Sequence, residues 1–278
     1  MTFDCFAVTA PGLAPLAARE LAALGIAATP AEAGGVPFTA DAAQLADAQL
    51  RLRTVSRVLV RLASFRATAF HELERAARQV DWGRILPAGA SFTLRVTCRK
   101  SRLYHSDAVA ERVAAAIVRA IPGANGIAGT AATDEAEDTA PVTVSAPQLF
   151  VVRFDHDRCT ISADASGALL HRRGYRLAVA RAPLRETLAA AMLLGVGYDP
   201  AHPLVDPFGG AGVAHDVEIR EAPLSALEPP PGRGLLIANP PYGVRVGETQ
   251  ALRDLFARLG QVARARCAGW DLALLSAD

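Results

Sequence analysis

Several residue types are scarce in this chain of 278 residues, and each scarcity excludes a class of protein. The four cysteines stand far apart, form no Cys-x-x-Cys pair and have no histidine at metal-ligand spacing: Cys5, Cys98, Cys159 and Cys267. Neither a zinc site nor a disulfide framework is therefore expected, and no metal is predicted. We interpret the cysteines as buried free thiols.

Long apolar runs and leader-like segments are missing as well. No run reaches the roughly 18 residues of a membrane span, and the N-terminus lacks a basic segment followed by an apolar core. We therefore expect a cytoplasmic protein with no membrane partner. A Gly-x-Gly-x-x-Gly motif opening a helix is absent too, which makes a nicotinamide oxidoreductase the least favoured function.

Lysine is represented by Lys100 alone, so nearly all positive charge is arginine, which suits phosphate contacts because its planar fork is bidentate. We attribute this scarcity to compositional bias. The net charge is only +1, but from Arg51 to Arg119 fourteen basic residues stand against five acidic ones, and from Ile121 to Ala165 two stand against seven. A local basic excess is expected of a face that meets nucleic-acid phosphates.

The length allows two domains of ordinary size, and 51% hydrophobic residues can fill a core in each. Periodicity predicts a mixed α+β first half, with strands at 3–9, 55–64, 91–98, 148–154 and 159–163 and helices at 13–24, 71–79 and 107–120. Gly25 is a helix stop signal, and Ser106 is predicted to cap the last of these helices. Residues 155–158 read as a hairpin turn.

The most informative segment is Leu235-Leu236-Ile237-Ala238-Asn239-Pro240-Pro241-Tyr242-Gly243, an apolar strand that ends in a polar site. Asn239 offers a side-chain carbonyl, the prolines supply carbonyls without N–H groups of their own, and Tyr242 offers a flat face for a base. These groups suit the binding of an exocyclic amine. The alternative is an ordinary strand end stopped by proline.

A second feature is the glycine turn Asp206-Pro207-Phe208-Gly209-Gly210-Ala211-Gly212, which follows the short apolar strand at 203–205. Glycines let the backbone approach a ligand closely, as in cofactor-binding α/β folds. Alone such a turn is a weak signal. Because a second apolar strand follows with Asn239 at its end, both sites are expected at the carboxyl ends of parallel strands, where open α/β sheets bind ligands.

Four motifs in order closely resemble the THUMP-containing RNA guanine-N2 methyltransferases, above all the bacterial enzymes of large-subunit ribosomal RNA. They are Leu170-His171-Arg172-Arg173-Gly174-Tyr175-Arg176, Ala182-Pro183-Leu184-Arg185-Glu186 and the two segments at Asp206 and Asn239. The resemblance implies a ferredoxin-like part over 1–50, a THUMP RNA-binding domain over 51–165 and a Rossmann-like α/β methyltransferase domain over 166–278. The first two form an α+β unit.

The resemblance also implies roles for individual residues. S-adenosylmethionine would lie against seven of them: Pro183, Leu184, Asp206, Pro207, Phe208, Gly210 and Gly212. The target amine would be held by Asn239, Pro240, Pro241 and Tyr242. From the basic segments themselves, we expect RNA to be bound by Arg99, Lys100, Arg102, Arg172, Arg173 and Tyr175. For the basic connector at 169–176, a solvated linker is the alternative to an RNA-facing bridge.

The chain departs from the family in two places. Asp206 and Asn239 are 33 positions apart, whereas a doubly wound sheet needs two further strands there, so on the order of 50 residues are missing near 212–214. Residues 215–227 already look like the third strand and its loop, and Pro223 stands where a carboxylate near the adenine is usual. The chain also stops before the family's last strands. Either a segment is missing from this sequence, which we favour, or the domain is shortened and holds cofactor poorly.

Several functions stay open beside methyl transfer to guanine N2 of ribosomal RNA. Asn-Pro-Pro-Tyr also suits adenine and glutamine amines, so transfer to DNA or protein is an alternative, and transfer RNA is a second RNA substrate. The alternative from another functional class is a non-catalytic RNA-binding module whose methyltransferase domain has lost its activity. The basic N-terminal half favours RNA.

Overall fold

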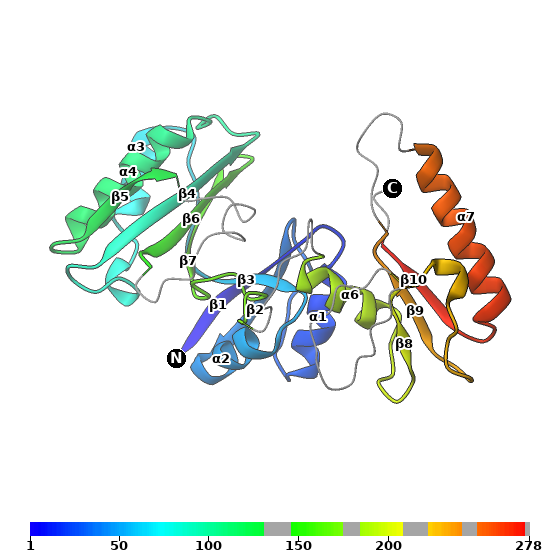
Figure 1. Ribbon diagram of the computed structural model, residues 1–278. Coiled ribbons are helices and arrows are strands. Elements are labelled where there is room, and N and C mark those ends of the chain that lie inside the picture. The colour runs from blue at the N-terminus through cyan, green and yellow to red at the C-terminus, as the bar shows by residue number, and fades with distance from the viewer. Residues whose placement is uncertain (131–145, 175–183, 208–221, 241–248, 276–278) are drawn as a thin grey trace. The chain divides into compact units, whose positions relative to one another are not determined.

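The computed structural model describes residues 1–130, 146–174, 184–207, 222–240 and 249–275. The chain divides into two compact units, Met1–Arg172 and Arg173–Asp278, called unit 1 and unit 2 below. Figure 1 shows the labelled helices and strands of both. Each unit is described separately.

Unit 1 begins with two helices packed on a three-strand part of its sheet. The order is β1 (Thr2–Thr9), α1 (Ala14–Ala23), β2 (Gly35–Asp41), α2 (Ala42–Arg51) and β3 (Val55–Arg66). α1 ends before Gly25, whose φ of 71° confirms it as the stop signal. α2 begins at a capping box, because Asp41 accepts from the Gln44 N–H and the Gln44 side chain accepts from the Asp41 N–H.

The second part of unit 1 continues the same sheet. It contains α3 (Phe70–Ala77), η1 (Trp82–Arg84), β4 (Ser91–Arg99), α4 (Ser106–Ala120), β5 (Asn125–Thr130), β6 (Gln148–Asp155) and β7 (Arg158–Asp164). The seven strands lie in the order β2-β1-β3-β7-β6-β4-β5. β3 pairs with β1 on one side and β7 on the other, so it joins the two parts into one sheet.

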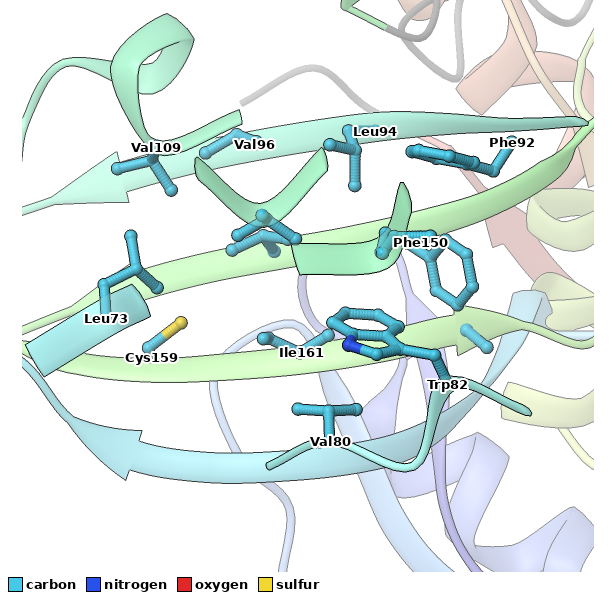
Figure 2. Packing of buried hydrophobic residues seen from close by; sticks show 14 of the residues in the cluster. Leu73, Val80, Trp82, Phe92, Leu94, Val96, Val109, Phe150, Cys159 and Ile161 are labelled. Atoms are coloured by element: carbon cyan, nitrogen blue, oxygen red, sulfur yellow. The ribbon is translucent and has the colours of Figure 1, made fainter. Parts of the chain in front are cut away.

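The helices of unit 1 cover one face of this sheet. Val60 of β3 packs with the core under α1 and α2, and its register partner Ala163 of β7 packs with the core under α3 and α4. Register partners point to the same face, so both cores lie on one side. The ring centroids of Trp82 and Phe150 are 5.3 Å apart, edge to face, and the Trp82 indole donates to the Ala77 carbonyl at 2.9 Å. Figure 2 shows Trp82 and Phe150 among the buried residues of the core under α3 and α4.

Unit 2 contains a smaller parallel sheet. Its described elements are α6 (Glu186–Gly195), β8 (Leu204–Val205), η2 (Leu224–Ala226), β9 (Leu235–Ala238), α7 (Thr249–Arg266) and β10 (Asp271–Leu274). The strands lie in the order β10-β9-β8, and both pairs are parallel. Leu236 and Ala238 of β9 are buried against Leu259 of α7 and Cys267.

The sequence predicts most of these elements and misses four. The strands β2 and β5 and the helices α2 and α7 were not predicted. The prediction of Ser106 as a cap was wrong, because α4 begins at Ser106 and its N-cap is His105, which makes no side-chain capping bond. The described part of the predicted third strand at 215–227 contains only the 3-10 turn η2, and its residues 215–221 lie outside the described ranges.

Candidate functional site

The predicted methyl-transfer residues follow two neighbouring strands. β8 pairs in parallel with β9, with Val205 opposite Leu236, so Asp206 follows one strand and Asn239 the other. Parallel neighbours end at the same edge of a sheet. The structure therefore brings Asp206 and Pro207 to the edge that also carries Asn239 and Pro240. That edge is where open α/β sheets bind their ligands.

The local sequence explains why β9 presents Asn239 there. The strand is apolar on both faces, as expected of a strand with a parallel neighbour on each side. Gly234, directly before it, lies so close to Trp270 that an added Cβ would come within 2.7 Å of the indole. The β10 strand continues the ladder past the strand end, because the Leu275 N–H donates to the Ala238 carbonyl at 3.0 Å. Asn239 thus leaves a strand that is paired up to its last residue.

The other residues of the predicted site are only partly described. Leu184 precedes Arg185, the N-cap of α6. Six residues lie outside the described ranges, and nothing is derived from their positions: Pro183, Phe208, Gly210, Gly212, Pro241 and Tyr242.

The predicted RNA-binding arginines fall into two groups. Arg99, Lys100 and Arg102 are exposed, at the end of β4 and in the loop before α4. Arg172 ends unit 1 and Arg173 begins unit 2, while Tyr175 lies outside the described residues.

The connector at 169–176 begins packed on unit 1. Leu169 and His171 are buried, and the Leu170 N–H donates to the Ser56 carbonyl at 2.9 Å. Arg172 is half-buried and Arg173 is exposed. The solvated-linker alternative is therefore wrong for 169–171, because these residues belong to the packed edge of unit 1.

The loop between β4 and α4 also carries two rings that the sequence reasoning missed. The Tyr104 and His105 ring centroids are 4.0 Å apart, and Tyr104 is 67% exposed. The sequence signal for such a surface was the pair Tyr104-His105, which follows three cations within residues 99–105. We name residues 99–105 the basic loop.

The cysteines are free thiols, as the sequence predicts. Cys5, Cys159 and Cys267 are buried and Cys98 is half-buried, so the prediction of burial is confirmed for three. Burial raises the pKa of Cys5 and of Cys159 to about 12.

Within the described ranges, histidine, cysteine and carboxylate side chains form no group that could hold a metal ion. No helix in the same ranges is long and apolar enough to cross a membrane.

Three family models match successive parts of the chain. The RlmL ferredoxin-like domain matches residues 4–59, the THUMP domain matches 67–164, and the RMKL-like methyltransferase domain matches 173–215 and 211–278. Together with the fold, these matches make the chain a THUMP-containing protein of the methyltransferase fold. The α/β fold class, with its ferredoxin-like and THUMP parts, is thereby confirmed.

Individual relatives agree with this class. The chain is 26% identical over 360 aligned residues to the ribosomal RNA large subunit methyltransferase K/L of Methylococcus capsulatus, covering 100% of this chain and 47% of that protein. Its fold is similar to a predicted N6-adenine-specific DNA methylase from Listeria monocytogenes, at 25% identity and a TM-score of 0.83, covering 100% and 89% of the two chains. SMU.472, crystallised as a complex with SAH, has the same fold, at 21% identity and a TM-score of 0.78, covering 100% and 90%.

The chain thus spans about half the length of the K/L methyltransferase that it matches, and about half of the second such enzyme, from Syntrophotalea carbinolica.

Proposed function

We propose that this chain is an S-adenosylmethionine-dependent methyltransferase that acts on RNA and methylates the N2 amine of a guanine in ribosomal RNA. The observation that carries the proposal is the register of β8 and β9, which sets Asp206 and Asn239 at one sheet edge. The THUMP match, the K/L methyltransferase relative and the SAH bound by SMU.472 support it.

The residues at this edge suit the parts of such a reaction. Asp206 and Pro207, with the glycines that follow, would hold the cofactor, and Pro183 and Leu184 would line its pocket. S-adenosylmethionine supplies a methyl group that its sulfonium already activates. The chain's own contribution is therefore positioning: it aligns the nitrogen lone pair and excludes water.

Asn239 would act on the nucleophile. A guanine amine is a poor nucleophile because its lone pair is conjugated with the ring. Hydrogen bonds that it donates to the Asn239 side-chain carbonyl and the Pro240 carbonyl would favour a pyramidal nitrogen. Transfer would form a nitrogen–carbon bond and break the sulfur–carbon bond, and the amine would lose one proton to solvent. The base must first leave its stack, with Tyr242 as its stacking partner.

A second candidate is an RNA-binding protein without transferase activity. It is favoured by the short connection between β8 and β9 and by the match to the methyltransferase family in two segments that overlap at 211–215. The alignment with the K/L methyltransferase runs over 360 positions, more than the 278 residues of this chain, and so contains long gaps on this side. If the missing strands carried the ribose-binding acid, cofactor would bind weakly.

Transfer of tritium from labelled S-adenosylmethionine to ribosomal RNA tests the proposal. The wild-type chain should label RNA, and Asn239→Ala should lower the rate by about a hundredfold or more, as losing one preorganised polar group at a reacting centre does. Gln261→Ala, an exposed amide on α7 of the same unit, is the matched control and should keep full activity.

A comparison of ribosomal RNA, transfer RNA, DNA and protein as substrates shows which kind of amine is methylated. Labelling of ribosomal RNA but not of transfer RNA, DNA or protein supports the proposal, and labelling of adenine in DNA would replace it with the activity named for the Listeria protein. Nuclease digestion of the product should yield N2-methylguanosine. An Asn239→Ala variant that transfers at the wild-type rate would remove Asn239 from the site.

A further inference from the structure

The basic loop presents an aromatic ring to solvent on a rigid support. Tyr104 is 67% exposed, although its neighbour Leu103 is buried at 5% in the core under α3 and α4. The His105 ring lies against it at 4.0 Å with an interplanar angle of 39°. The Tyr104 ring is not part of the core of unit 1, so much of its surface is available to a ligand.

Hydrogen bonds to the turn between β6 and β7 fix the shape of the basic loop. The Ser101 hydroxyl donates to the Arg99 carbonyl at 2.8 Å and accepts from the Asp157 N–H at 3.0 Å. The Arg102 N–H donates to the Asp157 carboxylate at 2.8 Å. Lys100 adopts a left-handed φ of 45° within this network. The loop is therefore ordered before any ligand arrives, which lowers the entropy cost of binding.

Positive charge surrounds the two rings. Arg99, Lys100 and Arg102 are exposed within the loop. Arg66, at the end of β3, has a side chain 77% exposed and lies 3.9 Å from the Asp157 carboxylate. Arg158, which pairs with Arg66 in the sheet register, is exposed as well. Three acidic residues belong to the same elements, namely Asp155, Asp157 and Asp107 in the first turn of α4, so the five cations outnumber them.

We propose that Tyr104, backed by His105, is a stacking platform for an unpaired RNA base, and that the cations of the basic loop hold the phosphates beside it. A ring with one open face and flanking arginines is the arrangement that binds single-stranded nucleic acid. A base inside a duplex has both faces covered, so it cannot stack on this ring. The inference rests on the proposed function in that it takes RNA as the substrate, and it specifies that the RNA contains an unpaired nucleotide at this surface.

The test compares two labelled RNAs that share one stem, one with a single-stranded tail and one with a blunt end. Fluorescence anisotropy with the full chain and no cofactor measures both affinities. Wild type should prefer the tailed RNA. Tyr104→Ala should weaken tailed binding by about tenfold and leave blunt binding unchanged, because only stacking is lost. Tyr104→Phe keeps the ring and should bind both RNAs like wild type.

Charge variants separate stacking from phosphate contacts. Arg102→Ala should weaken both RNAs to a similar extent and reduce the salt dependence of binding. Arg119→Ala, an exposed arginine at the other end of α4, is the matched control and should change neither. Equal loss of both RNAs in Tyr104→Ala, or no loss of either, would overturn the platform.

The two proposals can fail independently. Selective loss of tailed RNA in Tyr104→Ala, in a chain that transfers no methyl group, would support the platform and reject the enzymatic function. Methyl transfer to RNA that Tyr104→Ala leaves unchanged, together with unchanged binding, would reject the platform and leave the function standing. Circular dichroism of Tyr104→Ala should match wild type, because the side chain is exposed.

Discussion

The two units differ in how much apolar side chain they bury. Unit 1 has clusters of nineteen and thirteen buried hydrophobic residues, whereas the described part of unit 2 has one of four. Described strands are six to twelve residues long in unit 1 and two to four in unit 2. Burial of apolar surface is the main stabilising contribution, so unit 1 should be the more stable. We therefore expect the unit that carries the predicted chemistry to be the less stable one.

This difference in buried apolar side chains agrees with different roles for the units, recognition for unit 1 and ligand binding for unit 2. Unit 1 has the rigid sheet and the ordered basic loop that a recognition surface needs. In unit 2 the described core lies under β9, and the predicted ligand residues follow directly from its strand ends. Sites drawn from the less stable part of a fold can adjust when a ligand binds.

The largest expected effect lies in unit 1, where Arg57 of β3 and Asp164 of β7 form a buried ion pair. Asp164→Ala should lower the free energy of unfolding of unit 1 by about 3–5 kcal/mol, because it leaves a guanidinium charge in the interior. Urea denaturation followed by Trp82 fluorescence in a Trp270→Phe background measures it. The control is Glu32→Ala, which removes the more exposed pair with Arg61 and should cost about 0–1 kcal/mol. Equal losses in both variants would contradict the assignment.

A core substitution in unit 2 should separate the two units. Leu259 is 1% exposed, and Leu259→Ala should destabilise unit 2 by about 2–4 kcal/mol through the cavity that it leaves. Trp270 packs on the same core and reports this in a Trp82→Phe background. The Trp82 transition, measured in the complementary background, should not move. A joint shift of both transitions would show that the units unfold together and would break the comparison.

Thiol reactivity should show the smallest effect of the difference in stability between the two units. As urea rises, Cys267 of unit 2 should be alkylated before Cys5 and Cys159 of unit 1, as peptide mass spectrometry can follow. The two unit 1 thiols keep their protons to about pH 12 when folded, against the ordinary value of 9.0. Their contribution to stability is therefore complete below about pH 9 and is lost as the pH rises towards 12. Alkylation of Cys5, Cys159 and Cys267 at the same urea concentration would show that the two units do not differ in stability.

The sequence predicts most of the long strands and helices of unit 1 because their patterns are strong, but it misses α7 of unit 2. The predicted strand at 55–64 is β3, and the hairpin turn at 155–158 is confirmed by left-handed φ values of 50° and 62° at His156 and Asp157. The missed strands β2 and β5 contain glycine or proline and lack clear alternation: Gly35-Val36-Pro37 in one and Asn125-Gly126 in the other. Their place in the sheet is set by tertiary pairing, which a local pattern does not encode.

The candidate site was also predictable only in part. That Asp206 and Asn239 meet at one edge follows from two apolar strands in a parallel sheet, and the register of β8 with β9 agrees. The roles assigned to these residues stay predictions, as do the domain boundaries at 50 and 165. The sequence at 99–105 shows that Tyr104 follows three cations, but its exposure depends on how the basic loop folds against the turn at Asp157.

Binding of S-adenosylmethionine to the whole chain, measured by isothermal titration calorimetry, tests the central claim most directly. The account predicts saturable binding to one site, weakened about tenfold or more by Asp206→Ala and unchanged by Asp199→Ala, an exposed acid of the same unit. A chain that binds RNA but shows no heat of cofactor binding at saturating concentration would contradict it. Unit 2 would then be a shortened relic of the methyltransferase fold attached to an RNA-binding unit.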